Sequence, residues 1–292
     1  MILVFGAGGQ LGQELAISAA ATRTPLTGVG RDVDIADPRM VAGAIERTAA
    51  SLVVNAAAFT RVDDAEREVA AAHRANVEGP AVVAAESARR DIPLIHISTD
   101  YIFDGEKGAP YLEDDEPNPL NRYGATKLAG EIAVRETHPR HLIIRSGWLF
   151  GAYGNNFLVR FLARAGQGER LGVVADRHGS PTAAVDLAEA ILRIAPTLQS
   201  GRTGSPRGTY HFAGSERATW HELAAHALAL RARLTGQSPE LEAISSSALK
   251  AAALRPRDVT LDSRRFAAAF GFSARPWREG IERAVRQLVR SG

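Results

Sequence analysis

The sequence predicts an α/β protein built on a doubly wound parallel sheet, with a smaller C-terminal lobe. Three observations lead to this fold class. Short apolar runs typical of buried strands alternate with helical patterns through residues 1–150. The first of these runs ends in a glycine-rich turn. Beyond Leu149 the alternation breaks and gives way to loops, helices with an apolar face and one isolated strand pattern.

The first apolar run, Ile2–Phe5, leads into the turn Gly6-Ala-Gly-Gly-Gln-Leu-Gly12 and then into a helical pattern. This order of strand, glycine turn and helix is the context of a dinucleotide site in a Rossmann domain. Gly6 permits the tight turn, Gly9 lets the backbone approach a pyrophosphate, and Gly12 allows close packing of helix on strand. The phosphates are then expected at the positive end of the helix.

The second strand is expected within residues 25–30, and the residue that follows it bears on the choice of cofactor. Arg31 stands where an acidic ribose ligand is usual. An arginine at that point can bind a 2′-phosphate, which favours NADPH over NADH. Asp34 lies three residues further on and can still accept from a ribose hydroxyl, so NADH remains the alternative.

Two further strands are expected to deliver residues to the same edge of the sheet. Leu52–Asn55 runs into Ala56–Ala58, whose small side chains let a cofactor lie close to the backbone. Leu94–Ile97 ends at Ser98-Thr99-Asp100, on the carboxyl edge where open parallel sheets bind ligands. We expect His96, inside this strand, to be a core histidine rather than a catalyst.

Tyr123 and Lys127 carry the chemistry that the sequence predicts. Residues four apart on a helix share one face, so the phenol and the ammonium point into the same space. A nearby positive charge is expected to lower the pKa of the phenol. A tyrosine tuned in this way can give its proton to a carbonyl oxygen while hydride reaches the carbon. The alternative is a solvated pair on a helix face.

The remaining segments define the domain organisation that we expect. Lys107–Asn121 is a loop, and its acidic run Glu113–Glu116 is expected to be solvated rather than to bind a metal. Later patterns predict helices near 157–165, 185–194, 220–230 and 277–288, a strand at 209–213, and another strand earlier at 141–145. We expect residues 1–150, together with about 183–214, to form the dinucleotide-binding Rossmann domain. Residues 151–182 and 215–292 are expected to form a substrate-binding lobe.

Composition narrows the class of protein. The chain has 292 residues, a hydrophobic content of 45% and a net charge of +2, which is not the footprint of a nucleic-acid-binding protein. The absence of cysteine excludes disulfides, thiolate metal sites and cysteine nucleophiles. The sequence shows no signal peptide and no apolar run of 18 residues. We therefore expect a cytoplasmic protein with no membrane partner, either monomeric or homodimeric.

Nearly the whole chain resembles the extended short-chain dehydrogenase/reductases, and within them the dTDP-4-dehydrorhamnose reductase family. Two of the matching motifs, the glycine turn and the Tyr123/Lys127 pair, are shared with a very large superfamily. Three of the other motifs, at residues 98–101, 145–148 and 154–157, are much narrower. The resemblance is carried by residues 5–12, 54–58, 98–103, 119–131, 145–148, 154–157 and 179–182.

This resemblance implies an activity and a set of site residues. The activity is NADPH-dependent reduction of the 4-keto group of dTDP-4-dehydro-L-rhamnose to dTDP-L-rhamnose, with a tyrosine as proton donor. The implied catalytic residues are Thr99, Tyr123 and Lys127. The implied cofactor-binding residues are Gly6, Gly9, Gln10, Leu11, Arg31, Asp34, Ile35, Ala56, Ala57, Ala58, Tyr123 and Lys127. The implied substrate-binding residues are Thr99, Asp100, Tyr101, Phe103, Trp148 and Asn156.

The chain also departs from the family pattern. Arg177 replaces a glutamine that the family usually has, and Val259 replaces a hydroxyl residue. Glu14 fits one position of a metal site through which some members dimerise, but Val185 stands where a second acid is expected, so we predict no metal. Two alternatives stay open at this point. One is a reductase of another 4-keto-6-deoxy nucleotide sugar, and the other is a non-catalytic regulatory subunit resembling that of methionine adenosyltransferase.

Overall fold

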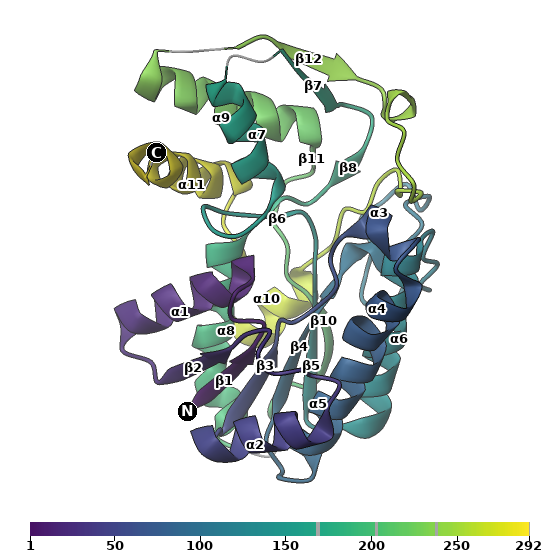
Figure 1. The fold of residues 1–292 in the computed structure, drawn as a ribbon, viewed down its shortest axis with the longest axis vertical. Helices are drawn as coiled ribbons and strands as arrows, with labels where there is room; N and C mark the ends of the chain where they lie inside the picture. Colours follow the sequence, from purple (N-terminus) through teal and green to yellow (C-terminus); the bar gives the residue numbers. More distant parts are fainter. Residues whose placement is uncertain (168–169, 202–203, 237–238, 292) are drawn as a thin grey trace.

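Six parallel strands form the central sheet, in the order β10-β5-β4-β3-β1-β2 (Figure 1). The computed structural model describes residues 1–167, 170–201, 204–236 and 239–291. Because β1 lies between β2 and β3, the chain reverses its direction across the sheet at this point, which is the doubly wound topology. The strands are β1 (Ile2–Phe5), β2 (Leu26–Val29), β3 (Leu52–Asn55), β4 (Leu94–Thr99), β5 (His141–Ser146) and β10 (Gly208–His211).

The predicted fold class is confirmed, and so are the predicted strands. Ile2–Phe5 and Leu52–Asn55 form strands with the bounds expected from their apolar runs. β4 continues two residues beyond its apolar core, so Ser98 and Thr99 belong to the strand itself. His96 is fully buried within β4, and its Nδ1 lies 3.3 Å from the side-chain nitrogen of Asn55, as expected for a core histidine.

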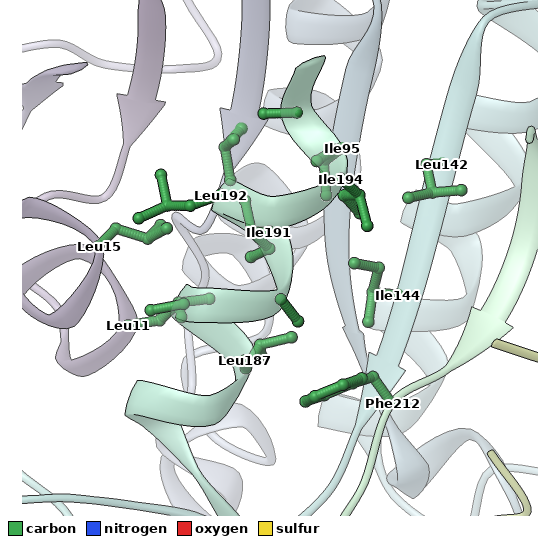
Figure 2. Packing of buried hydrophobic residues seen from close by; sticks show 14 of the residues in the cluster. Leu11, Leu15, Ile95, Leu142, Ile144, Leu187, Ile191, Leu192, Ile194 and Phe212 are labelled. Atoms are coloured by element: carbon green, nitrogen blue, oxygen red, sulfur yellow. The ribbon is translucent and has the colours of Figure 1, made fainter. Parts of the chain in front are cut away.

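Helices cover both faces of the sheet because alternate residues of each strand point to opposite sides. Ile2 and Val4 pack in a cluster with residues of α1 (Gln10–Thr22), α8 (Ala184–Gln199) and α10 (Arg264–Phe270). Figure 2 shows Leu11 and Leu15 of α1 and Leu187 and Ile191 of α8 in this cluster. Leu3 and Phe5 pack on the other face, against α2 (Pro38–Thr48), α5 (Gly79–Ala88) and α6 (Arg122–Thr137).

A π-helical turn, Arg74–Glu78, leads into α5 and positions α6. The Asn76 side chain in this turn accepts from the Phe59 backbone nitrogen at 2.8 Å and donates to the Thr126 hydroxyl at 3.0 Å. Gly130 lets α6 approach, because a Cβ there would lie 2.1 Å from the Asn76 carbonyl oxygen. The short helices α3 (Val62–Ala65) and α4 (Val69–His73) precede this turn.

A second apolar cluster forms beyond one end of the sheet, in the upper part of Figure 1. Trp277, which is 1% exposed, packs there among residues of α7 (Phe157–Gly166), α9 (Trp220–Thr235) and α11 (Trp277–Ser291). Three strand pairs complete this part: β6 (Leu149–Phe150) with β9 (Thr182–Ala183), β7 (Leu171–Val174) with β12 (Leu241–Ile244), and β8 (His178–Gly179) with β11 (Ala218–Thr219). Two 3₁₀ turns lie at Asp100–Ile102 and Ser246–Ala248. Within the described residues, no helix has both the length and the apolar character needed to cross a membrane.

The acidic run in the loop before α6 is only partly solvated. Glu113 is 7% exposed, and its carboxylate accepts a 3.0 Å hydrogen bond from the His211 backbone nitrogen. The expectation that the whole run is solvated is therefore wrong for Glu113. The reason is an isolated β-bridge between Tyr111 and Leu261, which holds this part of the loop against a segment near the C-terminal end of the chain.

Candidate active site

The loops that follow β1 and β3 touch at the carboxyl edge of the sheet. Gly6 has φ +87°, and a Cβ there would lie 2.6 Å from the Ala57 backbone nitrogen. A Cβ on Gly12 would lie 2.4 Å from the Gly6 carbonyl oxygen, so α1 packs directly on the turn. Both positions therefore exclude any side chain. The three alanines Ala56, Ala57 and Ala58 remain partly exposed beside this turn.

The start of α1 has the features of a phosphate site. Gly9 is the N-cap residue, and no side chain among the described residues caps the helix. Its first backbone N–H groups and the positive end of the helix dipole are thus available to an anion. Gln10 and Leu11 form the first turn, and Gly154 packs over them, since a Cβ there would lie 3.1 Å from the Gln10 nitrogen. The cradle fits the pyrophosphate of a dinucleotide, whose nicotinamide ring supplies hydride chemistry.

Three residues predicted near the adenosine have different surroundings. Arg31 is exposed at the end of β2, and no described carboxylate lies within 4.0 Å of it. Asp34 is held by Arg74 at 2.7 Å and by the Ala36 backbone nitrogen at 2.9 Å, and its pKa is lowered chiefly by the hydrogen bond from Arg74. Ile35 is buried in the core cluster on the α2 side of the sheet. Of these three residues, Arg31 is therefore the charged one without an ion-pair partner among the described residues.

Thr99, Tyr123 and Lys127 come together where β4 ends and α6 begins. The side chain of Asn121 caps α6 by accepting from the Gly124 nitrogen at 2.8 Å. Gly124 allows the helix to start directly against the turn after β4, because a Cβ there would meet the Tyr101 carbonyl oxygen at 2.0 Å. The sequence-predicted juxtaposition of the strand end with the tyrosine–lysine pair is thus present.

The surroundings of Lys127 and Tyr123 set their protonation. The Lys127 ammonium is buried and donates to the Ile97 carbonyl oxygen at 2.7 Å. Burial lowers the pKa of Lys127 to about 8, and the charge of Glu131 opposes this change. Burial raises the pKa of the Tyr123 phenol to about 12; the hydrogen bond with Thr99 works against this rise, and the charge of Asp100 adds to it.

The expected lowering of the Tyr123 pKa by Lys127 is therefore wrong. The Lys127 ammonium is directed to the Ile97 carbonyl oxygen, and burial of the phenol outweighs the other influences. With a pKa this high, the phenol keeps its proton at neutral pH. In this state Tyr123 is equipped to act as an acid rather than as a base.

Asp100 is a buried carboxyl group next to Thr99. It is 2% exposed, and its Oδ1 accepts from the Thr99 hydroxyl at 3.0 Å. Its Oδ2 has no hydrogen-bond partner among the described residues and lies against Gly147, where a Cβ would be 2.2 Å away. Burial raises the pKa of Asp100 to about 7, and the hydrogen bond from Thr99 opposes this change.

Trp148 is fixed in place by its neighbours. Its backbone has φ +48°, an unusual conformation for a bulky residue. Its indole stacks on that of Trp220 with centroids 3.9 Å apart and an interplanar angle of 10°. On Gly179, a Cβ would lie 2.5 Å from the Trp148 ring, so this glycine makes room for the indole. Sequence reasoning missed Trp220, which carries no local signal of this contact.

Two other predicted substrate residues lie deeper in the structure. Phe103 is fully buried and stacks on Tyr111, with centroids 4.1 Å apart. Asn156 caps α7 by accepting from the Val159 nitrogen at 3.2 Å, and its amide donates to the Gly151 carbonyl oxygen at 3.1 Å. Their side chains are thus committed to packing and to loop structure. Asp100 and Tyr101, in contrast, interact with Tyr123: Asp100 acts through its charge, and Tyr101 through a contact between the two rings.

Tyr101 links the tyrosine–lysine pair to the C-terminal part of the chain. Its ring meets that of Tyr123 edge-on, with centroids 5.8 Å apart. Burial raises the pKa of the Tyr101 phenol, the charge of Arg255 opposes this rise, and Arg255 pairs with Asp63 at 2.6 Å. Asp63 also accepts from the Ala253 backbone nitrogen at 3.0 Å. Sequence reasoning assigned no role to Arg255, because its partners lie far away along the chain.

Comparison with known proteins gives the family. The family model described as the RmlD substrate binding domain matches residues 1–290. The chain belongs to this family. It is 35% identical over 292 residues to the dTDP-4-dehydrorhamnose reductase of Sinorhizobium fredii, covering 100% of this chain and 98% of the relative. It is 37% identical over 294 residues to the enzyme of that name from Burkholderia thailandensis, covering 99% of each.

A solved structure agrees with this result. The dTDP-4-dehydrorhamnose reductase of Bacillus anthracis, in complex with NADP, superimposes with a TM-score of 0.88 at 31% sequence identity and covers 98% of each chain. The resemblance predicted from the motifs is therefore confirmed. The family is one of NAD(P)-dependent oxidoreductases, as the sequence predicts.

Proposed function

We propose that this protein reduces the 4-keto group of dTDP-4-dehydro-L-rhamnose to dTDP-L-rhamnose with NADPH. The observation that carries the proposal is the meeting of Thr99, Tyr123 and Lys127 where β4 ends, on the same carboxyl edge of the parallel sheet as the glycine turn before α1. The names of its relatives support the substrate, and the NADP-bound structure supports the cofactor.

The site residues divide the work as follows. When bound, NADPH would supply hydride to the carbonyl carbon. The protonated phenol of Tyr123 gives its proton to the O4 atom as the carbonyl becomes an alcohol, which balances the reaction. Thr99 would hold the same oxygen by turning its hydroxyl toward it from Asp100 Oδ1, to which that hydroxyl donates in the structure. The Lys127 ammonium, oriented by the Ile97 carbonyl, holds the nicotinamide ribose.

The remaining predicted residues are proposed to surround these groups. Gly6, Gly9, Gln10, Leu11 and Ala56–Ala58 line the dinucleotide. Arg31 binds the 2′-phosphate that distinguishes NADPH from NADH, a role supported by its freedom from any described carboxylate. Asp100, Tyr101 and Trp148 border the sugar.

We also propose a division of the chain into two functional parts. Residues 1–150, with α8 and β10, form the cofactor domain, since α8 packs on α1 and β10 extends the sheet. The substrate lobe comprises residues 151–182 and 215–292. Within that last range α10 belongs physically to the cofactor domain, because Phe266 packs in the same cluster as Ile2 and Val4.

The test is NADPH oxidation followed at 340 nm, with dTDP-4-dehydro-L-rhamnose generated from dTDP-glucose. The wild type is expected to turn over, and Tyr123→Phe to lose about 10²-fold or more in kcat while still binding NADPH. Turnover only on a different keto sugar would mean that this sugar, and not dTDP-4-dehydro-L-rhamnose, is the substrate. A folded, NADPH-binding protein without turnover on any keto sugar would overturn the enzymatic assignment.

A further inference from the structure

Arg177 lies at the edge of the site and takes no part in the chemistry described so far. It comes immediately before β8, in which Gly179 faces the Trp148 indole. β8 is held on both sides. His178 pairs with Thr219 of β11, and the backbone nitrogen of His178 donates to the Arg257 carbonyl oxygen at 2.8 Å. The backbone that carries Arg177 is therefore well anchored beside Trp148.

The charge of Arg177 is not neutralised by any carboxylate that the structure describes. Its side chain is half-buried, and within residues 1–167, 170–201, 204–236 and 239–291 no carboxylate lies within 4.0 Å of it. The neighbouring Asp176 is engaged with Ser245 and Ser246 instead, at 2.8 and 2.9 Å. Taking a guanidinium partly out of water without a partner is unfavourable, so the arrangement favours an anionic ligand.

Two paired arginines in this region, Arg217 and Arg255, differ from Arg177. Arg217 pairs with Asp258 at 2.7 Å, and Arg255 pairs with Asp63 at 2.6 Å. These two guanidiniums are thus used to join parts of the chain. Arg177 keeps its positive charge free for a ligand.

Arg177 also contributes to the electrostatic surroundings of Tyr101. Burial raises the pKa of the Tyr101 phenol, and the charges of Arg255 and Arg177 both oppose this rise. Arg177 therefore acts on the phenol that stands edge-on to Tyr123 at 5.8 Å. The start of α1, where we expect the cofactor pyrophosphate, is formed by different residues.

We propose that Arg177 is a specificity residue that binds the diphosphate of the nucleotide sugar. The proposal rests on the proposed function, because it concerns the substrate of that site. A guanidinium presents a planar fork of donors that matches two phosphate oxygens and stays charged at every relevant pH. Arg177 would thus select nucleoside diphosphate derivatives over monophosphates and free sugars.

The experiment measures binding without turnover. Calorimetric titrations of dTDP, dTMP and NADPH are run on the wild type, Arg177→Gln, Arg177→Lys and the control Arg39→Gln, which alters an exposed arginine on α2. We expect Arg177→Gln to weaken dTDP binding about 10- to 100-fold. NADPH binding should not change, and the dTMP affinity should fall less than the dTDP affinity. Arg177→Lys should retain part of the dTDP affinity, and Arg39→Gln all of it.

The outcomes separate the two proposals. If the wild type binds dTDP and Arg177→Gln binds it equally well, the role of Arg177 is overturned while the proposed function stands. If the variant loses dTDP and NADPH binding together with thermal stability, Arg177 is structural and the role is again overturned. If the wild type binds NADPH but no dTDP, both the diphosphate role and the dTDP-sugar substrate are wrong.

Discussion

The Lys127 ammonium donates a 2.7 Å hydrogen bond to the main-chain oxygen of Ile97, the residue two positions before Thr99. This bond joins the first turns of α6 to the end of β4. The strand that supplies Thr99 and the helix that supplies Tyr123 are thus tied together by the third member of the proposed triad. Lys127 therefore fixes the position of α6 relative to β4, in addition to placing a positive charge there.

The pH profile of the reaction should report Lys127. Its pKa is lowered to about 8 by burial, so the ammonium is present below pH 8 and is lost as the pH rises through that value. We expect kcat/KM for reduction to be level below about pH 7.5 and to fall above pH 8. Steady-state rates between pH 6 and 10 measure this limb.

The matched variants for this limb are Lys127→Arg and Lys127→Met. The arginine keeps a charge throughout the range, so the fall above pH 8 should disappear even though the rate is lower. The methionine should cost about 10²-fold or more in kcat/KM at pH 7. An unchanged limb in Lys127→Arg would assign the titration to another group.

Asp100 should make stability depend on pH in a definite direction. Its folded-state pKa of about 7 lies above the usual value for aspartate, so its contribution is fully present below about pH 4 and is lost as the pH rises through 7. We expect Asp100→Asn to gain stability relative to the wild type between pH 5 and pH 8, by roughly 2–4 kcal/mol. Denaturant unfolding at both pH values measures the change in that difference.

Other titrating groups do not disturb this comparison. The Lys127 contribution changes only above about pH 8, because its folded pKa is about 8 and its unfolded pKa is higher. Burial lowers the pKa of His211 to about 3, so its contribution grows between about pH 3 and pH 6.5 and is complete above that range, equally in both proteins. A stability difference that stays constant from pH 5 to 8 would contradict the proposed state of Asp100.

The fold and much of the candidate site could be predicted from local sequence patterns. The glycine turn, the ends of β3 and β4, and the tyrosine–lysine spacing are each encoded within a few residues, so their chemistry can be read from the sequence. Contacts between distant segments could not be read in this way. Arg255 and Asp63 are 192 positions apart, and nothing near either residue indicates the other.

Burial depth was the second quantity that the sequence did not reveal. The spacing of Tyr123 and Lys127 correctly puts both residues on α6, but the direction of the phenol's pKa shift depends on how much water surrounds it. Likewise, Glu113 looks like a member of a solvated acidic run until His211 is brought beside it by the sheet. Both errors have the same origin, because each depends on packing by residues remote in the chain.

Two glycines of the dinucleotide turn should respond differently to the same substitution. A Cβ at Gly12 would lie 2.4 Å from the Gly6 carbonyl oxygen, and backbone atoms there cannot easily move. Gly12→Ala should therefore destabilise the fold by about 1–3 kcal/mol. At Gly8 a Cβ would meet no described atom within 4 Å, so Gly8→Ala should stay within about 0.5 kcal/mol of the wild type. Equal unfolding midpoints for the two variants would contradict the close helix–turn packing.

The buried ion pair behind the active site should be far more important for stability than an exposed one. Glu131 is fully buried on α6, and its carboxylate accepts from Arg145 Nη2 at 2.8 Å. Glu131→Gln would leave the Arg145 guanidinium without its counter-charge in the interior, so we expect a loss of about 3–5 kcal/mol. Glu282→Gln breaks an exposed pair with Arg286 on α11, and its effect on the unfolding free energy should be too small to measure. Urea unfolding of both variants checks the contrast, and similar losses would mean that burial does not govern these pairs.

Because Glu131 lies one turn beyond Lys127 on α6 and its charge raises the Lys127 pKa, Glu131→Gln should also move the alkaline limb of the rate profile to lower pH.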